Sequence, residues 1–178
     1  LTGGGTRGLM RVRPSGGSLE QMTTVDTLKG EVDHFWLHAL PDGRGVLFTI
    51  QKRSTREATD VAVLDSKSGT YHTLVRGLTA RYAPTGHLVY VTEGGDLMAA
   101  PFDLRKLAVT GEAFALTNGV AGRAFGAVDL VLSNTGTLMY EQGAQVTGSA
   151  EVVYVTRQGL ATTVDSGWTG NFQTVALS

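Results

Sequence analysis

The side chains that could carry chemistry in this chain are few and far apart. His34 and His38 stand four residues apart in a segment rich in aromatic and apolar residues. On a strand, that spacing places both imidazoles on one face about 13 Å apart, too far to share a metal unless the backbone bends. There is no cysteine, which excludes disulfides, thiolate zinc sites and cysteine nucleophiles. We therefore predict no metal site and no cofactor, and we expect each histidine to take a hydrogen-bonded structural place.

Hydrolytic chemistry also lacks its usual sequence marks. A serine nucleophile is normally presented on a G-x-S-x-G elbow, and this pentad does not occur. Glycoside hydrolysis needs two carboxyl groups at a defined separation. The acids near the expected inner strands are Glu31, Asp33 and Asp129, for which salt bridges or turns are the simpler roles. The residues that carry chemistry thus favour a non-catalytic protein.

The elements that must position these residues are indicated by a turn signal that recurs three times between short apolar runs. Its closing glycines are Gly43, Gly86 and Gly136, which gives intervals of 43 and 50 residues. A period in this range, with several short strands per repeat, is typical of a β-propeller blade. The three turns are Pro41-Asp42-Gly43, Pro84-Thr85-Gly86 and Asn134-Thr135-Gly136.

Each repeat is interpreted as four antiparallel strands. β-branched and aromatic residues are enriched in the apolar runs, and no segment keeps a helical period. In the first repeat the expected strands are 36–40, 45–50, 61–64 and 71–75. The second repeat has 80–83, 87–92, 97–101 and 113–116. The third has 128–132, 137–141, 152–155 and 160–164. The blade repeats are therefore placed at 34–75, 80–117 and 127–164.

The two ends of the chain are interpreted as parts of a further blade. Residues 9–12 and 19–23 form an outer strand pair, and residues 172–177 form an inner strand. Residues 1–25 and 170–178 thus make a partial blade, and residues 1–178 make a single all-β propeller domain or propeller fragment of about four blades. Either the ends close a small four-bladed ring, or the piece belongs to a larger propeller whose open edges pair with another copy.

Composition limits the partners. The 178 residues are 42% hydrophobic and 17% charged, with a formal net charge of −1. This apolar content suffices for a core, while the near-neutral charge offers no electrostatic footprint for nucleic acid. No apolar run reaches the roughly 18 residues that span a bilayer, and the sequence shows no signal peptide. We expect no nucleic-acid binding and no direct membrane insertion. If the propeller does not close within one chain, copies would associate through the open blade edges.

The repeats resemble TolB-type propeller repeats, most closely those found behind the catalytic domain of bacterial serine/threonine protein kinases. The resemblance rests on runs spread over nearly the whole chain: 34–36 with 40–49, 63–65 with Gly69, 81–90, 97–103 and 133–140. It implies a propeller that serves as a sensor or interaction module, and an extracytoplasmic sensor region. None of the kinase motifs is present in these residues.

The predicted function is therefore a non-catalytic, ligand- or protein-binding propeller that acts as a sensor or scaffold. Propeller ligands usually sit at one end of the central channel, where the inner strands begin. Trp36 is a binding candidate there, or else a core residue between blades. His38 and Arg81 both lie five residues before a turn glycine and should point the same way. A propeller hydrolase or lyase, or the accessory propeller of one, is the alternative. The channel candidates are Trp36, His38, Arg81, Asp129 and Gln173.

Overall fold

The fold is known from a computed structural model, in which the described residues form antiparallel β-sheets and contain no α-helix. The chain divides into two compact units, Leu1–Gln145 and Val146–Ser178. The described residues are 8–53, 59–122, 127–143, 150–151, 153–155, 161–165, 167 and 169–170. The all-β, antiparallel class expected from the strand pattern is thus confirmed.

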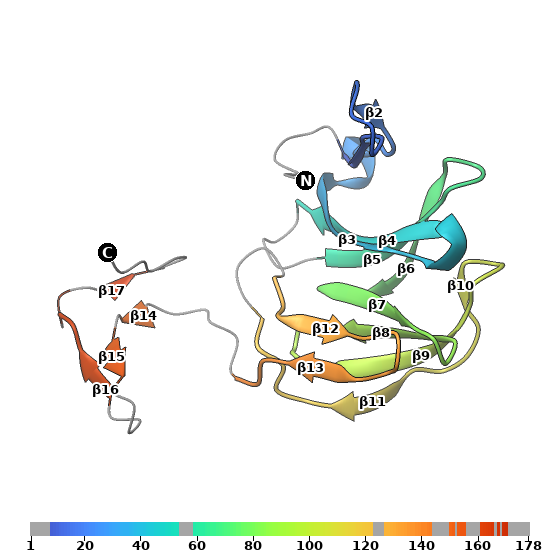
Figure 1. The fold of residues 1–178 in the computed structure, drawn as a ribbon. Coiled ribbons are helices and arrows are strands. Elements are labelled where there is room, and N and C mark those ends of the chain that lie inside the picture. Colours follow the sequence, from blue (N-terminus) through green and yellow to red (C-terminus); the bar gives the residue numbers. More distant parts are fainter. Residues whose placement is uncertain are drawn as a thin grey trace. The chain divides into compact units, whose positions relative to one another are not determined.

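The first sheet is a four-stranded antiparallel meander in the order β3-β4-β5-β6 (Figure 1). Its strands are β3 (Glu31–Ala39), β4 (Gly45–Lys52), β5 (Thr59–Asp65) and β6 (Tyr71–Arg76). The central strands are buried on both faces, since all residues of 47–50 and of 61–64 are buried. Such continuous burial requires material packed on both sides of the sheet.

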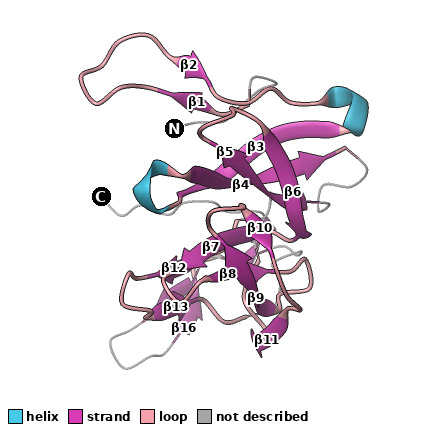
Figure 2. Ribbon diagram, turned by 90° about the vertical axis from the view of Figure 1, so that its right-hand side faces the viewer, coloured by secondary structure: helices cyan, strands magenta, loops and turns pink. Residues whose placement is uncertain are grey.

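The second sheet has the same plan, with its last position divided between two short strands. The order is β7-β8-β9-β10, and β11 pairs with the other end of β9. Figure 2 shows this sheet beside the first one. The strands are β7 (Thr79–Ala83), β8 (His87–Val91), β9 (Leu97–Asp103), β10 (Ala108–Val109) and β11 (Phe114–Thr117).

The remaining strands form two-stranded pairs. In the first unit, β1 (Met10–Arg11) pairs with β2 (Glu20–Gln21), and β12 (Leu130–Leu132) pairs with β13 (Leu138–Tyr140). In the second unit, β14 (Ala150–Glu151) pairs with β17 (Thr169–Gly170), and β15 (Val153–Val155) pairs with β16 (Ala161–Thr163). Short 3₁₀ turns occupy Thr27–Lys29 and Pro41–Gly43.

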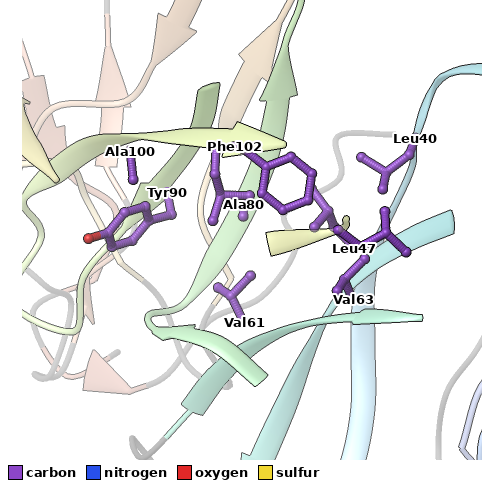
Figure 3. Close-up of a cluster of buried hydrophobic side chains, with 10 residues drawn as sticks. Leu40, Leu47, Val61, Val63, Ala80, Tyr90, Ala100 and Phe102 are labelled. Carbon is purple, nitrogen blue, oxygen red and sulfur yellow. The ribbon is translucent and has the colours of Figure 1, made fainter. Parts of the chain in front are cut away.

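The core of the first unit lies between successive sheets. One cluster joins Leu47, Val61 and Val63 of the first sheet to Leu88 and Phe102 of the second (Figure 3). A second cluster packs the other side of β7–β9 against the β12–β13 pair. A third cluster covers the opposite face of the first sheet with side chains from the N-terminal segment. Sheet therefore follows sheet along the chain, with an apolar layer at each contact.

The recurring turn has the conformation that its glycine predicts. Gly43, Gly86 and Gly136 all have positive φ, of 63°, 82° and 89°. A Cβ added at any of the three would meet nothing within 4 Å. Backbone conformation rather than space therefore requires glycine there. In the first turn Asp42 also has positive φ, as in the Asp-Gly turns of hairpins.

The expected strands of the first two repeats agree with the structure to within a few residues, apart from β3, which begins at Glu31. β10 was missed, as were β14 and β17. In the third repeat the inner pair β12–β13 falls in the first unit and the outer pair β15–β16 in the second. Of the partial blade, 9–12 and 19–23 contain β1 and β2, while 1–7 and 171–178 lie outside the described residues. Assembly of these strands into blades stays a prediction.

Candidate functional site

Strand β3 has the opposite of the usual burial pattern. Its polar residues Glu31 and His34 are 3% and 0% exposed. Its large apolar residues Val32, Trp36 and Leu37 are 37–41% exposed. This arrangement is unusual because burying charged or polar groups costs free energy unless they are hydrogen-bonded.

Two bulges in β3 explain why its polar residues are buried while its large apolar residues are exposed. The pairing with β4 shifts by one residue between Glu31 and Asp33, and again between Phe35 and His38. At the second bulge, Trp36 takes a φ of 54°, a left-handed conformation that is rare for so bulky a side chain. The first bulge brings Glu31 and His34 to the same side, since their partners on β4 are Lys52 and Ile50.

The second bulge separates the two histidines. His34 pairs with Ile50 and His38 with Leu47, and these partners are three residues apart, on opposite faces of β4. The expectation that His34 and His38 share a face is therefore wrong, because it assumed a regular strand. Trp36 is half-exposed rather than enclosed in a core between sheets. His34 has the hydrogen-bonded structural place that was expected.

A buried chain of hydrogen bonds runs through His34. Nε2 lies 3.0 Å from Glu31 Oε2, and Nδ1 lies 2.8 Å from Thr23 Oγ1. An ionised carboxylate can only accept, so Nε2 carries the proton, and the neutral ring accepts at Nδ1 from the Thr23 hydroxyl. Thr23 Oγ1 in turn accepts from the backbone N–H of Leu9 at 2.9 Å. The ring also packs on Phe48, with centroids 4.9 Å apart.

Glu31 is the centre of this network. Besides His34, its Oε2 accepts from the Tyr71 hydroxyl at 2.7 Å and from the Asp26 backbone N–H at 2.8 Å. The Tyr71 hydroxyl also lies 3.0 Å from the carbonyl oxygen of Thr24. One carboxylate oxygen thus joins strand β3, strand β6 and the N-terminal segment. We call Thr23, Glu31, His34 and Tyr71 the buried polar network.

The network shifts the pKa values of its members. Burial lowers the pKa of His34, and the neighbouring Glu31 only partly opposes this. For Glu31, burial is the largest influence and raises the pKa, but the bonds from Asp26, Tyr71 and His34 outweigh it, so the pKa is lowered. Burial and the Glu31 carboxylate raise the pKa of Tyr71. At neutral pH the network therefore holds an ionised carboxylate, a neutral imidazole and a neutral phenol.

A hollow of about 830 Å³ lies next to the network, with residues 21–29 and 69–71 as its walls. Thr23 and Tyr71 belong to both the hollow and the network. Polar and apolar side chains are mixed in its walls, and the charged pair Asp26 and Lys29 is joined at 3.1 Å. The hollow is within the size range of small-ligand pockets.

On the opposite face of the first sheet, His38 lies within the electrostatic reach of Arg81. That the two side chains point the same way, as their equal offsets from the turn glycines predict, stays a prediction. Burial lowers the pKa of His38 most, and the charge of Arg81 lowers it further. Arg81 donates from Nη1 to Thr79 Oγ1 at 3.0 Å and to the Ala80 carbonyl oxygen at 2.8 Å. Within the described part of the chain, no carboxylate forms an ion pair with Arg81.

Two further positions of the sequence prediction lie on the surface, and one lies outside the described residues. Asp129 is exposed, and its carbonyl oxygen accepts from the Glu141 N–H. Val131, which has the same offset from its turn glycine as His38 and Arg81, is 65% exposed. Gln173 lies outside the described residues. Among the described channel candidates, the charge of Arg81 acts on the pKa of His38.

Thr23, His34 and Glu31 follow the order hydroxyl, imidazole, carboxylate that is known from acyl-transfer enzymes. Here the hydroxyl is 4% exposed and already accepts the N–H of Leu9. In this arrangement the Thr23 hydroxyl holds the backbone of Leu9. Among the described residues, no three His, Asp or Glu side chains converge as metal ligands, and no helix is long and apolar enough to cross a membrane.

Comparison of the chain with protein-family models, with curated proteins and with solved structures gave no match in any of the three. The site is therefore defined by its geometry.

Sequence reasoning found His38 and Arg81 but missed the buried polar network. Glu31 and His34 are three residues apart, which on a regular strand would put them on opposite faces. Thr23 and Tyr71 carry no motif. The sequence does show two ionisable residues, Glu31 and His34, in a segment that also contains large apolar residues. This pattern does not predict which residues bond to them.

Proposed function

We propose that this chain is a non-catalytic binding module built from β-propeller blades, which serves as a sensor or scaffold. Two features support the fold assignment. A four-stranded antiparallel sheet, a five-stranded one and the β12–β13 pair follow one another along the chain, and an apolar layer lies between each and the next. The turn glycines that set the repeat all have the positive φ that the repeat requires. The resemblance to TolB-type repeats supports the same assignment.

The observation that carries the binding function is the state of Arg81. Its guanidinium is partly buried, and burial lowers its pKa. Its Nη1 bonds go to uncharged oxygens, and no acid of the described residues pairs with it. A partly desolvated charge without a counter-charge is destabilising, and an incoming anion would relieve this cost. Arginine also binds carboxylates in a two-pronged geometry that lysine cannot match.

The surroundings favour a ligand that combines an anionic group with apolar surface. His38 is neutral at pH 7, because burial and Arg81 lower its pKa, so it can donate or accept a hydrogen bond. On the same strand, Trp36 and Leu37 are each 41% exposed. Exposed aromatic and arginine side chains are common anchors of binding surfaces. A carboxylate carried by a small molecule or by a peptide fits this chemistry.

The test uses the coupling between Arg81 and His38. Acetate serves as the carboxylate probe, and chloride at the same ionic strength serves as the control. The pKa of His38 is followed by NMR of its imidazole. An anion on Arg81 cancels the charge that lowers this pKa, so acetate should raise the pKa of His38 saturably, whereas chloride should not.

Two variants make the experiment specific. R81Q should raise the pKa of His38 without any probe and remove its response to acetate. R76Q is the matched control, because Arg76 is an exposed arginine that is already paired with Glu93 at 3.1 Å. It should leave both the pKa of His38 and the response unchanged. If acetate and chloride act alike on the wild-type protein, Arg81 is not an anion site.

A further inference from the structure

The N-terminal segment, residues 8–29, is attached to the first sheet mainly through the buried polar network. Thr23 bonds to His34, the Thr24 carbonyl oxygen accepts from Tyr71, and the Asp26 N–H donates to Glu31. Each of these contacts pairs a group of the segment with an ionisable side chain of the sheet. The apolar part of the attachment consists of Leu9 and the partly buried Met22, which join the cluster on the sheet, and of Val25, which is 7% exposed.

Within the segment, the two strands are tied to the same point. The Leu9 N–H donates to Thr23 Oγ1, and the Met22 N–H donates to the Leu9 carbonyl oxygen at 2.8 Å. Gly8 approaches so closely that an added Cβ would lie 2.2 Å from the Thr23 carbonyl oxygen. The position of Leu9 and Met22 on the sheet is thus linked to the contact between Thr23 and His34.

We propose that residues 8–29 form a clasp on the first sheet that opens when His34 takes up a proton. The proton would enter at Nδ1, the ring nitrogen that accepts from Thr23 in the closed state. Once protonated, Nδ1 could only donate a hydrogen bond to Thr23 Oγ1. The hydroxyl hydrogen of Thr23, which points at Nδ1 in the closed state, would then need another acceptor. Thr23 is 4% exposed, so that hydrogen would lose its acceptor inside the protein. The unsatisfied donor therefore weakens the contact between Thr23 and His34, which holds the clasp on the sheet.

The groups around His34 determine the direction of the effect. Asp33, on the same strand, and Glu31 favour the proton, whereas Lys52 on β4 opposes it, and Lys52 is itself 3.3 Å from Asp60. Burial exceeds all of these influences, and the pKa of His34 is lowered. Because the pKa of His34 is lower in the folded protein, the neutral ring stabilises the fold at pH values above 6.5, the ordinary histidine pKa. This stabilisation is lost as the pH falls below 6.5. The pKa of Glu31 is also lowered, so it adds in the same direction at lower pH, below its ordinary value of 4.5.

The loss is local because the clasp has few other contacts. The central strands β4 and β5 are held by a continuous ladder and by apolar packing on both faces. Segments with little buried apolar area open at lower free energy than the core. Acidification should therefore release residues 8–29 before the sheets unfold, and uncover the apolar face around Phe48 and Leu64.

Amide hydrogen exchange tests this proposal. Protection factors are measured between pH 7 and pH 4.5 for the amides of Leu9, Met22 and Asp26, with the β5 amides as reference. The clasp amides should lose at least tenfold in protection as pH falls, while the β5 amides keep theirs. If the clasp and β5 amides change together, or if neither changes, the proposal is wrong.

Two variants assign the effect to the proton on His34. H34Q retains a donor for Glu31 and an acceptor for Thr23 but does not titrate, so its clasp should show no pH dependence above pH 4.5. H72Q is the control, because His72 bonds to the Leu107 carbonyl oxygen outside the clasp. It should keep the wild-type pH dependence. If H34Q fails to fold, the ¹⁵N shifts of His34 in the wild-type protein decide: opening must follow the titration of Nδ1.

Discussion

The carboxylate of Glu31 accepts a hydrogen bond of 2.7 Å from the hydroxyl of Tyr71, which lies forty residues later in the chain. The bond joins the first and last strands of a four-stranded sheet to the N-terminal segment, because the same hydroxyl reaches the Thr24 carbonyl oxygen. Four predictions follow from this and related contacts.

Replacing Tyr71 by phenylalanine should destabilise the protein and weaken its acid resistance. Y71F removes one of the donors that lower the pKa of Glu31, so that pKa should rise. Loss of a hydrogen bond to a buried charge should reduce the free energy of unfolding by about 1–3 kcal/mol, measured by urea denaturation at pH 7. Y90F is the control, since Tyr90 is a buried phenol with no hydrogen bond among the described residues. Equal losses in both variants would contradict the role of Tyr71.

The pairing of Arg44 with Asp65 should be visible as a titration. Arg44 donates from Nη1 and Nη2 to the two oxygens of Asp65, and it lowers the pKa of that carboxyl to about 2. A lowered carboxyl pKa stabilises the fold above the ordinary value of 3.8, and this stabilisation is lost as pH falls toward about 2. R44A should therefore raise the pKa of Asp65, measured by carboxyl ¹³C NMR. K67A should not, because Lys67 acts through its backbone N–H. An unchanged pKa in R44A would refute the pairing.

The turn glycines should be sensitive to alanine for conformational reasons alone. Gly86 has a φ of 82° with open space where a side chain would lie. G86A should cost about 1–2 kcal/mol in thermal or urea unfolding, and G86N should cost less, because asparagine tolerates the left-handed region better. Gly94 lacks a positive φ, and its nearest neighbours are 3.8 Å from an added Cβ. G94A should stay within about 0.5 kcal/mol of wild type. The reverse order of G86A and G94A would contradict the turn geometry.

The apolar layer between the first and second sheets should dominate stability. Leu88 is fully buried there, so L88A should cost about 2–5 kcal/mol of unfolding free energy. L28A makes the same chemical change at a side chain that is 98% exposed, and it should cost less than about 0.5 kcal/mol. A small effect of L88A would mean that the two sheets do not depend on each other for stability.

Much of the local structure was predictable from the sequence. Apolar runs rich in β-branched and aromatic residues located the strands of the first two repeats, and glycines close to proline or aspartate located their turns. These signals succeed because strand and turn preferences act over a few neighbouring residues.

The buried polar network could not be predicted in this way. Bulges at Val32 and Trp36 shift the phase of β3, so that Glu31 and His34 share a side while His34 and His38 do not. A bulge changes the facing of every later residue in a strand, yet it leaves little trace in a pattern of period two. Trp36 at positive φ illustrates the point, because no propensity predicts a tryptophan there.

The sequence by itself determined that this is a β protein whose glycine turns recur along the chain. Only the tertiary structure decided that Thr23, Glu31, His34 and Tyr71 meet in the interior. The physical reason is that tertiary packing decides which residues of β3 face each side of the sheet. The N-terminal segment covers the first sheet and brings Leu9 and Thr23 onto it. The bulges of β3 turn Glu31 and His34 toward that segment, where their buried polar groups are hydrogen-bonded.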